Sequence, residues 1–310
     1  MPGPLLLAAT LFLAAVLAAS APPSAGRVRV LTADEAGPAL GTFSILDSRS
    51  EREFRSGHIP GARRVDWRDF TLEKPGALSN LLGNSAGWGK VPPADARLEA
   101  RLRALGLSNA RPVLVVGAPG GWGEEGRIAW NLLYWGALDV ALLDGGMPAW
   151  SARPSRPIET GRERASAGGN ADAKPGDFAL AIRPERRIEM KGMKAVVDER
   201  SRPILDVRTN EEYAGEKMTG QARGGHLPGA RLVVEKALYR TDGRYVDAAD
   251  LTRLTGLAAG SPSPAVYCVG GVRSALLALL LEARLGVVAA NYDGSIWEWS
   301  ATKELPLVTP

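Results

Sequence analysis

The chain contains an internal duplication, and this feature constrains its fold more than any other. Three short segments recur later in the chain in the same order. They are ILDSR at 45–49 and ILDVR at 204–208, GHIPGAR at 57–63 and GHLPGAR at 225–231, and LDGGMPAW at 143–150 and YDGSIWEW at 292–299. The copies lie about a domain length apart, which is too long for a solenoid repeat. A chain of 310 residues also has room for two domains of about 150 residues each.

Both copies alternate short apolar runs with helical patterns. The expected elements are strands at 111–117 and 140–143 around a helix at 128–135, and strands at 264–267 and 287–292 around a helix at 274–285. Apolar strands that are joined by helices form a mainly parallel sheet covered on both faces. We therefore predict an α/β fold with two such units. The last of these helices is apolar nearly all round, so we expect it to be buried, and Gly286 closes it.

The duplication and the local composition divide the chain into four parts. Residues 1–25 form a predicted signal peptide, 27–150 the N-terminal domain, 151–176 a linker and 177–310 the C-terminal domain. The linker is assigned because it is rich in Arg, Pro, Gly, Ala and Ser and has little apolar periodicity.

The N-terminus predicts export. An apolar run at 5–19 precedes small residues at 20–25, and the first charged side chain is Arg27. The pattern is typical of a secretory signal cleaved after Ala21 or Ala25, and it is short for a membrane span, which needs about 20 apolar residues. No cysteine lies near the cleavage region, which excludes a lipid-modified N-terminus. We expect a periplasmic or secreted protein without membrane contact once the signal is removed.

The charge pattern excludes one class of partner. The net charge is +4 and the pI is about 9.3, but arginines alternate with acidic residues and no basic run has the length of a nucleic-acid-binding arm. We therefore expect no nucleic-acid partner. A small anionic substrate would still be attracted to this surface.

The cysteine and histidine inventory excludes several chemistries. The chain has one cysteine, Cys268, and two histidines, His58 and His226. These numbers exclude an intramolecular disulfide framework and a zinc site built on several Cys and His ligands. No G-x-G-x-x-G motif follows a predicted strand and opens a helix, so a dinucleotide cofactor is not expected. We expect neither a metal nor a cofactor.

Cys268 lies at a position where α/β proteins bind ligands. It follows the predicted strand at 264–267 and begins the segment CVGGVRS, which runs directly into a helix. Ligands of open α/β sheets bind outside the carboxyl ends of the strands. The two glycines let the backbone curl, so that N–H groups point inward and form an anion cradle with the helix dipole. The residues expected to bind substrate in this way are Val269, Gly270, Gly271 and Val272.

The same surroundings favour a reactive thiol at Cys268. Inward N–H groups and a helix dipole lower the pKa of a thiol and favour the nucleophilic thiolate. Arg273 adds a positive charge at the far side of the loop, and we predict that it binds the substrate anion. The alternative is a buried structural cysteine, the commoner role of a lone cysteine. The strand-end position, the glycine pair and Arg273 favour the catalytic role, as does the retention of an oxidisable thiol in an exported protein.

Taken together, these segments resemble the tandem rhodanese-type sulfurtransferases. The resemblance rests on the two H-[IL]-P-G-A turns, the D-x-R strand ends, the cysteine loop and the YDGS segment at 292–295, and it covers nearly the whole chain after the signal. It implies two tandem rhodanese-like domains, of which the C-terminal one is catalytic and the N-terminal one is a degenerate copy. The corresponding strand end of the first unit, GAPGGW at 117–122, has no thiol. This agrees with a non-catalytic N-terminal domain.

The resemblance implies sulfur transfer. The Cys268 thiolate would attack the outer sulfur of a donor such as thiosulfate, release sulfite and become a persulfide, which the loop N–H groups would stabilise. Cyanide or a thiol would then remove the sulfur in a ping-pong cycle. Arg208 matches the family's substrate-anion arginine in the D-x-R segment. An ion pair of Arg208 with Asp206 or Glu211 remains the alternative.

The cysteine loop departs from both tandem types. Thiosulfate-type enzymes of the family usually carry two basic residues after the cysteine and mercaptopyruvate-type enzymes carry Gly-Ser-Gly, whereas residues 269–271 are Val-Gly-Gly. An arginine at the sixth loop position, Arg273, is closer to single-domain rhodaneses, which use small sulfane donors. We therefore favour thiosulfate as the donor and keep 3-mercaptopyruvate as the alternative. A non-catalytic persulfide carrier or protein-binding module is the third reading.

A phosphatase is the nearest enzyme of another class. Its cysteine-to-arginine loop needs five intervening residues to surround a phosphate, and only four separate Cys268 from Arg273. His58 and His226 both precede Pro-Gly-Ala, and a duplicated position favours a role in folding; an acid/base role for His58 across the domain interface is the alternative. We interpret Trp122 as a packing residue, and note that residues 120–123 are candidates for bordering the cleft between the domains.

Overall fold

A computed structural model describes residues 26–72, 87–161 and 175–310. The predicted signal peptide at 1–25 lies outside the described residues, as does the part of the predicted linker at 162–174. Within the described ranges, no helix is both long enough and apolar enough to cross a membrane.

The first unit is built on a five-stranded parallel sheet. Its strands are β1 (Arg27–Leu31), β2 (Ser44–Asp47), β3 (Arg63–Arg64), β4 (Val113–Val116) and β5 (Asp139–Leu143). Their spatial order is β1-β5-β4-β2-β3, and every pairing is parallel. Helices precede or follow nearly every strand: α1 (Ala33–Ala36), η1 (Gly37–Thr42), α2 (Glu51–Ser56), η2 (Trp67–Phe70), α4 (Ala96–Ala104), α5 (Glu124–Trp135) and α6 (Gly146–Ser151).

The second unit repeats this plan with four strands. They are β6 (Ile204–Asp206), β7 (Ala230–Leu232), β8 (Ala265–Tyr267) and β9 (Ala290–Asn291), in the parallel order β7-β6-β8-β9. The helices are η3 (Pro184–Arg186), α7 (Met190–Glu199), α8 (Asn210–Ala214), η4 (Glu235–Leu238), α9 (Ala248–Thr255), α10 (Arg273–Leu285) and α11 (Ser295–Ala301). The order matches that of the first sheet when β2 to β5 are aligned with β6 to β9, so the duplicated α/β fold predicted from the sequence is confirmed.

The element boundaries differ most from the expected ones in two places. Helix α5 begins at Glu124 rather than at Ile128, because its first turn is acidic and therefore invisible to a search for apolar periodicity. Strand β9 covers only Ala290–Asn291 instead of 287–292, because it pairs with a neighbour, β8, that is itself three residues long. Helix α10 is as predicted: it is buried along most of its length and ends at Gly286, whose φ is +69°.

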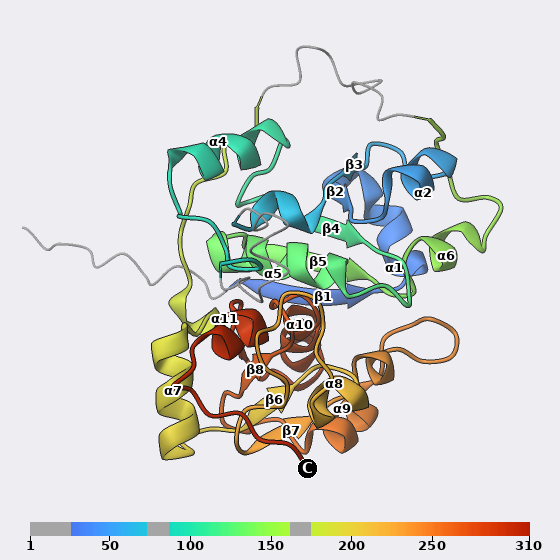
Figure 1. Cartoon of the computed structure of the whole chain (residues 1–310). Coiled ribbons are helices and arrows are strands. Elements are labelled where there is room, and N and C mark those ends of the chain that lie inside the picture. The colour runs from blue at the N-terminus through green and yellow to red at the C-terminus, as the bar shows by residue number, and fades with distance from the viewer. Residues whose placement is uncertain (1–25, 73–86, 162–174) are drawn as a thin grey trace, which may run out of the picture.

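The two units share one hydrophobic core. Helix α5 of the first unit packs against α10 of the second, and the same core cluster contains Trp130 and Leu133 together with Leu276 and Leu280. Figure 1 shows α10 at the boundary, next to α5 and β1. The helices approach so closely that a Cβ on Gly126 would lie 2.6 Å from the Leu276 Cα. A side chain at position 126 would therefore fit only if the two helices moved apart.

The duplicated D-x-R and His-Pro-Gly-Ala segments perform the same structural task in each unit. Arg208 donates to both carboxylate oxygens of Asp206, at 2.6 to 3.1 Å, and to the Gly225 carbonyl at 2.9 Å. In the first unit the side chains of Asp47 and Arg49 are paired in the same way, and Arg49 donates to the Gly57 carbonyl. The motif therefore ties the end of one strand to the following turn.

The two histidines also have equivalent environments. His58 stacks on Phe54 at 3.8 Å and its Nδ1 lies 2.8 Å from the Phe54 carbonyl oxygen; His226 stacks on Tyr213 at 3.6 Å and its Nδ1 lies 2.9 Å from the Tyr213 carbonyl oxygen. The backbone of each histidine also forms an antiparallel β-bridge with a later segment: His58 pairs with Glu159, and His226 pairs with Val308. Both are buried and serve the turn, as the duplication indicates.

A buried carboxyl group joins the units on another side of the interface. Glu125, near the start of α5, accepts hydrogen bonds from the hydroxyls of Tyr239 and Tyr245 of the second unit, both at 2.9 Å. The side chain is fully enclosed, and burial raises its pKa from about 4.5 to about 7, against the opposing effect of these hydrogen bonds. The folded protein therefore holds this group in its neutral form in mildly acidic solution.

We expect Glu125 to make the protein less stable as the pH rises from about 4.5 to about 7. In this window the unfolded chain has lost the proton while the folded protein keeps it, so the free energy of unfolding falls, by at most about 3 kcal/mol for this group. Glu125→Gln keeps an acceptor for both tyrosines and should remove that slope. Urea unfolding at several pH values measures how the free energy of unfolding changes with pH. Glu185→Gln, which removes an exposed carboxylate, is the control. Equal slopes for the unaltered protein, Glu125→Gln and Glu185→Gln would contradict the role assigned to Glu125.

Candidate functional site

Cys268 follows the last residue of β8 and faces a cavity between the two units. Only 1% of the residue is exposed. The cavity, about 210 Å³ in volume, is called here the Cys268 cavity, and its wall includes Val269, Gly270, Val272 and Arg273 of the predicted loop. Gly271 belongs to the same loop without lining the cavity. The structure thus brings together the thiol, most of the predicted loop residues and Arg273.

The loop conformation depends on its two glycines for different reasons. Gly270 is needed because a Cβ there would lie 2.1 Å from the Trp297 ring. Gly271 is needed because its φ is +75°, in the left-handed region that side chains with a Cβ rarely adopt. The same glycine also lies against Asp293, whose Cα would be 2.6 Å from an added Cβ. The glycine pair in the sequence therefore reflects close packing as well as turn geometry.

The backbone of the loop is anchored by the start of α11. The N–H groups of Ile296 and Trp297 donate to the carbonyl oxygens of Cys268 and Val269, at 3.3 and 3.0 Å. The N–H of Cys268 donates to the Ser295 hydroxyl at 3.1 Å. These hydrogen bonds hold the loop backbone against α11, so residues outside the loop help to fix its conformation.

The thiol environment stabilises the thiolate. Burial by itself raises the pKa of Cys268, but the charge of Arg273 and hydrogen bonds from the Ser274 and Gly270 N–H groups outweigh it, so the pKa lies below its usual value. The direction is that expected from the sequence. A nucleophilic sulfur is therefore available near neutral pH to a greater degree than in a free cysteine.

Arg273 is held by a carboxylate that the sequence analysis did not single out. Its two Nη atoms donate to the two carboxylate oxygens of Glu212, at 2.7 and 2.9 Å, and both side chains are 4% exposed. Its guanidinium also lies 4.9 Å from the Trp122 ring. The pKa of Glu212, which burial by itself would raise, is lowered by this pairing. Arg273 therefore acts on Cys268 by its charge at a fixed place, with its outer nitrogens already bonded.

Arg208 is not part of this site. It is completely buried, paired with Asp206, and absent from the wall of the Cys268 cavity. Of the two roles that the sequence left open for Arg208, the structure favours the ion pair. The duplicated Asp47–Arg49 pair in the unit without a thiol supports this reading.

The remaining wall of the Cys268 cavity is largely aromatic and comes from both units. Trp67, Trp88 and Trp122 belong to the first unit, and Met218 and Trp297 to the second. Trp88 stacks on Trp297 across the interface, with ring centroids 4.1 Å apart. Trp122 is 50% exposed, so our interpretation of Trp122 as a packing residue is wrong. Of the candidate border at 120–123, Trp122 lines the Cys268 cavity.

The backbone of the first unit also contacts the cysteine loop directly. Gly89 lies so close that a Cβ there would be 2.4 Å from the Gly270 carbonyl oxygen. Next to it, the Val91 N–H donates to Asp293 at 2.8 Å, and Lys90 pairs with Glu298 at 2.6 Å. The segment 88–91 is therefore in contact with both the cysteine loop and α11. No motif in the sequence marks it, because its role depends on docking of the two units.

Arg127 is a further functional candidate that the sequence did not indicate. This α5 side chain is completely buried and donates to the carbonyl oxygens of Gly271, at 3.0 Å, and Gly89, at 2.5 Å. Burial lowers its pKa to about 10, while attraction to Asp293 and Cys268 opposes that shift. A buried cation from the unit without a thiol thus contributes to the electrostatic field at Cys268. The only signal in the sequence is that Arg127 is a charged residue directly before an apolar helical run.

Among the described residues, no group of three or more His, Cys, Asp or Glu side chains is placed to hold a metal ion.

Comparison with known proteins gives one family and consistent relatives. The family model described as a rhodanese-like domain matches residues 32–153 and 189–302. The chain is 30% identical over 297 residues to "Putative thiosulfate sulfurtransferase SseB" of Mycobacterium tuberculosis, covering 91% of this chain and 97% of that protein. It is 29% identical over 275 residues to "Probable 3-mercaptopyruvate sulfurtransferase" of Pseudomonas aeruginosa, covering 86% and 90%.

A solved structure has the same fold. The 3-mercaptopyruvate sulfurtransferase from Leishmania major is similar with a TM-score of 0.68 over 90% of this chain and 76% of that one, at 22% identity. At this identity the likeness speaks for the architecture of two tandem units.

We expect Arg127→Gln to raise the thiol pKa of Cys268 by about one unit, because it removes a buried positive charge near the thiolate. The pH dependence of the alkylation rate with iodoacetamide measures this pKa. Arg127→Lys keeps the charge and should shift it less.

Arg183→Gln is the matched control for this measurement. Arg183 is also buried and donates to the backbone carbonyls of Leu133 and Ala137 in the first unit. Its replacement should leave the pH midpoint of the alkylation rate of Cys268 unchanged. A folded Arg127→Gln protein with an unchanged midpoint would show that Arg127 is purely structural.

Proposed function

This chain belongs to the rhodanese-like family, and from that premise we propose that Cys268 is the sulfur-carrying nucleophile of its sulfur-transfer reaction. The chain is a sulfurtransferase, the activity after which the two relatives described above are named, and it matches 97% and 90% of their lengths. The observation that carries the assignment is the single thiol at a strand end, with its pKa lowered and its loop held against a cavity. The first unit has no thiol and supplies walls and contacts.

The proposed cycle has two displacement steps. The Cys268 thiolate attacks the outer sulfur of thiosulfate, the S–S bond of the donor breaks, and sulfite leaves with the bonding electrons. Cys268 then carries a persulfide, whose negative charge is stabilised by the N–H groups around the thiol and by Arg273. A nucleophilic acceptor, cyanide or a thiol, attacks the outer sulfur of the persulfide, and the thiolate of Cys268 is restored.

Thiosulfate is the proposed donor because its cleavage needs no proton donor. Sulfite leaves as an anion, whereas cleavage of the C–S bond of 3-mercaptopyruvate leaves an enolate that must be protonated. The hydroxyls next to Cys268 are already engaged: Ser274 donates to the Asn291 side chain at 2.7 Å, and Ser295 donates to the Tyr292 carbonyl at 2.6 Å. 3-Mercaptopyruvate is the second candidate, since a relative carries that name.

Export of the protein is a separate proposal. It is supported by the apolar run at 5–19 and the small residues at 20–25. The N-terminal sequence of the protein recovered from a bacterial periplasm or culture medium tests it: a start at Pro22 or Gly26 supports cleavage, and an intact Met1 in the cytosol contradicts it.

We expect incubation with thiosulfate to add one sulfur atom to the protein, and cyanide to remove it as thiocyanate. Intact-mass measurement follows both steps. Cys268→Ser should lose both, because no other thiol exists in the chain. Initial rates with 3-mercaptopyruvate in place of thiosulfate decide the donor. Hydrolysis of an aryl phosphate without any sulfur adduct would favour a phosphatase, and a stable adduct that cyanide and thiols remove only slowly would favour a persulfide carrier.

A further inference from the structure

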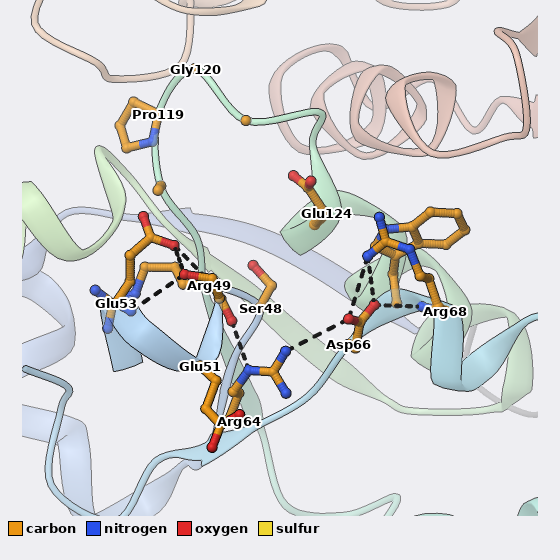
Figure 2. Close-up of a pocket in the computed structure, with 14 residues that line it drawn as sticks. Ser48, Arg49, Glu51, Glu53, Arg64, Asp66, Arg68, Pro119, Gly120 and Glu124 are labelled. Carbon is orange, nitrogen blue, oxygen red and sulfur yellow. Dashed lines mark hydrogen bonds and ion pairs between the residues drawn. The ribbon is translucent and has the colours of Figure 1, made fainter. Parts of the chain in front are cut away.

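The first unit has its own cavity where the second has the cysteine loop. It lies at the carboxyl ends of β2 and β4, is about 450 Å³ in volume, and is called here the polar cavity (Figure 2). Its wall is formed by three segments, at 48–53, 64–68 and 118–121, together with Glu124. The volume is within the range of small-molecule sites, about 300 to 1,000 Å³, and the position is one where α/β folds bind ligands.

The strand-end loop of the first unit cannot act as an anion cradle. The N–H of Trp122 donates to Oε2 of Glu124 at 2.8 Å, and a Cβ on Gly121 would lie 2.8 Å from the same oxygen. A carboxylate of the chain therefore occupies the place where the equivalent loop of the second unit faces the thiol. The polar cavity is suited to binding a charged group beside this loop rather than to chemistry within it.

The polar cavity presents both signs of charge. Arg64 and Arg68 flank a single carboxylate, Asp66, at 3.6 and 3.1 Å, so these three side chains together carry one net positive charge. The Arg68 side chain is 58% exposed. The half-buried carboxylate of Glu124 supplies the opposite charge on the side next to the Cys268 cavity. The wall also contains Arg49, Glu51 and Glu53, which are paired with Asp47, Arg55 and the Ser50 N–H, respectively. Figure 2 shows Glu124 between the loop at Gly120 and Arg68. A site of this kind complements a zwitterion, with its carboxylate at the arginines and its ammonium at Glu124.

The polar cavity adjoins the Cys268 cavity. Trp67, Arg68 and Glu124 line both of them. The Cys268 cavity is bounded mainly by apolar side chains, such as those of Trp88 and Trp297. The wall of the polar cavity consists largely of charged residues. A ligand that reaches from one cavity into the other would therefore have its sulfur at Cys268, a short apolar stem beside Trp67, and a charged head between Arg68 and Glu124.

We propose that the polar cavity of the first unit binds the amino-acid head of the sulfur acceptor, and that the acceptor is therefore a thiol of the cysteine type, with a free α-ammonium and α-carboxylate group. The inference rests on the proposed persulfide at Cys268. In the step it describes, the acceptor thiolate attacks the outer sulfur of the Cys268 persulfide, the S–S bond of the persulfide breaks, and the electron pair returns to Cys268 as thiolate. The product is the acceptor's persulfide, whose terminal sulfur carries the negative charge that the Cys268 persulfide carried before the transfer.

Four thiols on the unaltered protein test the charge requirement. The protein is first loaded with thiosulfate, and sulfur release is then followed with L-cysteine, cysteamine, 3-mercaptopropionate and 2-mercaptoethanol. The second lacks the carboxylate, the third the ammonium and the fourth both. Rates are expressed per thiolate and divided by the rate of the same thiol with a small disulfide, since nucleophilicity varies with thiol pKa. We expect kcat/KM for L-cysteine to exceed that of each singly charged thiol by about tenfold, the effect of one charge-assisted hydrogen bond. Equal corrected rates for all four would overturn the proposal.

Two variants assign the charges to their partners. Arg68→Gln should lower kcat/KM about tenfold for L-cysteine and 3-mercaptopropionate but not for cysteamine. Glu124→Gln should do so for L-cysteine and cysteamine but not for 3-mercaptopropionate. Arg97→Gln, at an exposed arginine of α4 that lines neither cavity, is the control and should change none of them. A uniform loss with all thiols in both variants would mean that these residues act only through the fold.

Cyanide separates this inference from the proposed function. If thiosulfate leaves no sulfur on Cys268, or cyanide does not remove it, the persulfide mechanism itself is wrong. If cyanide removes the sulfur and the four thiols have equal corrected rates, only the assignment of the polar cavity is wrong.

Discussion

The contact of the first unit with the cysteine loop is the constraint on which the rest of the site depends. Gly89 lies against the Gly270 carbonyl and Arg127 donates to the Gly271 carbonyl, so the loop is shaped between two domains. That contact exists only because α5 and α10 pack at the distance that Gly126 permits. Since the Arg127 guanidinium is enclosed by this packing, its charge acts in a low-dielectric environment, where it has a larger effect on a nearby thiol than at the surface.

The two units share one plan, but only the second has a thiol, and this difference divides the work between them. Both retain the D-x-R pair, the stacked histidine and the same strand order, which are requirements of the fold. At the strand end where the second unit has Cys268, the first has a loop whose Trp122 N–H is bonded by Glu124. Without a thiol of its own, that strand end borders a charged cavity next to the Cys268 cavity, and this is why we assign it a part in acceptor selection.

Much of the fold could be predicted because it depends on local patterns. Apolar runs between helical segments indicated the parallel sheets, and Gly286 correctly indicated the end of α10. The start of α5 was missed because acidic first-turn residues carry no apolar signal, and the length of β9 was overestimated because pairing, which depends on a partner strand, limits it. Arg208 was left undecided because the sequence shows a charge beside a carboxylate but not whether water can reach it.

The sequence by itself determined the duplicated α/β plan and pointed to Cys268, Arg273 and the glycine loop, because motif, strand end and helix start are adjacent in the chain. Only the tertiary structure decided what surrounds them. Glu212, Arg127, Trp88 and the shared wall of the two cavities come from segments far from Cys268 in sequence. Their proximity is a consequence of how the two units pack, and packing is set by the fit of whole helix faces rather than by any local run of residues.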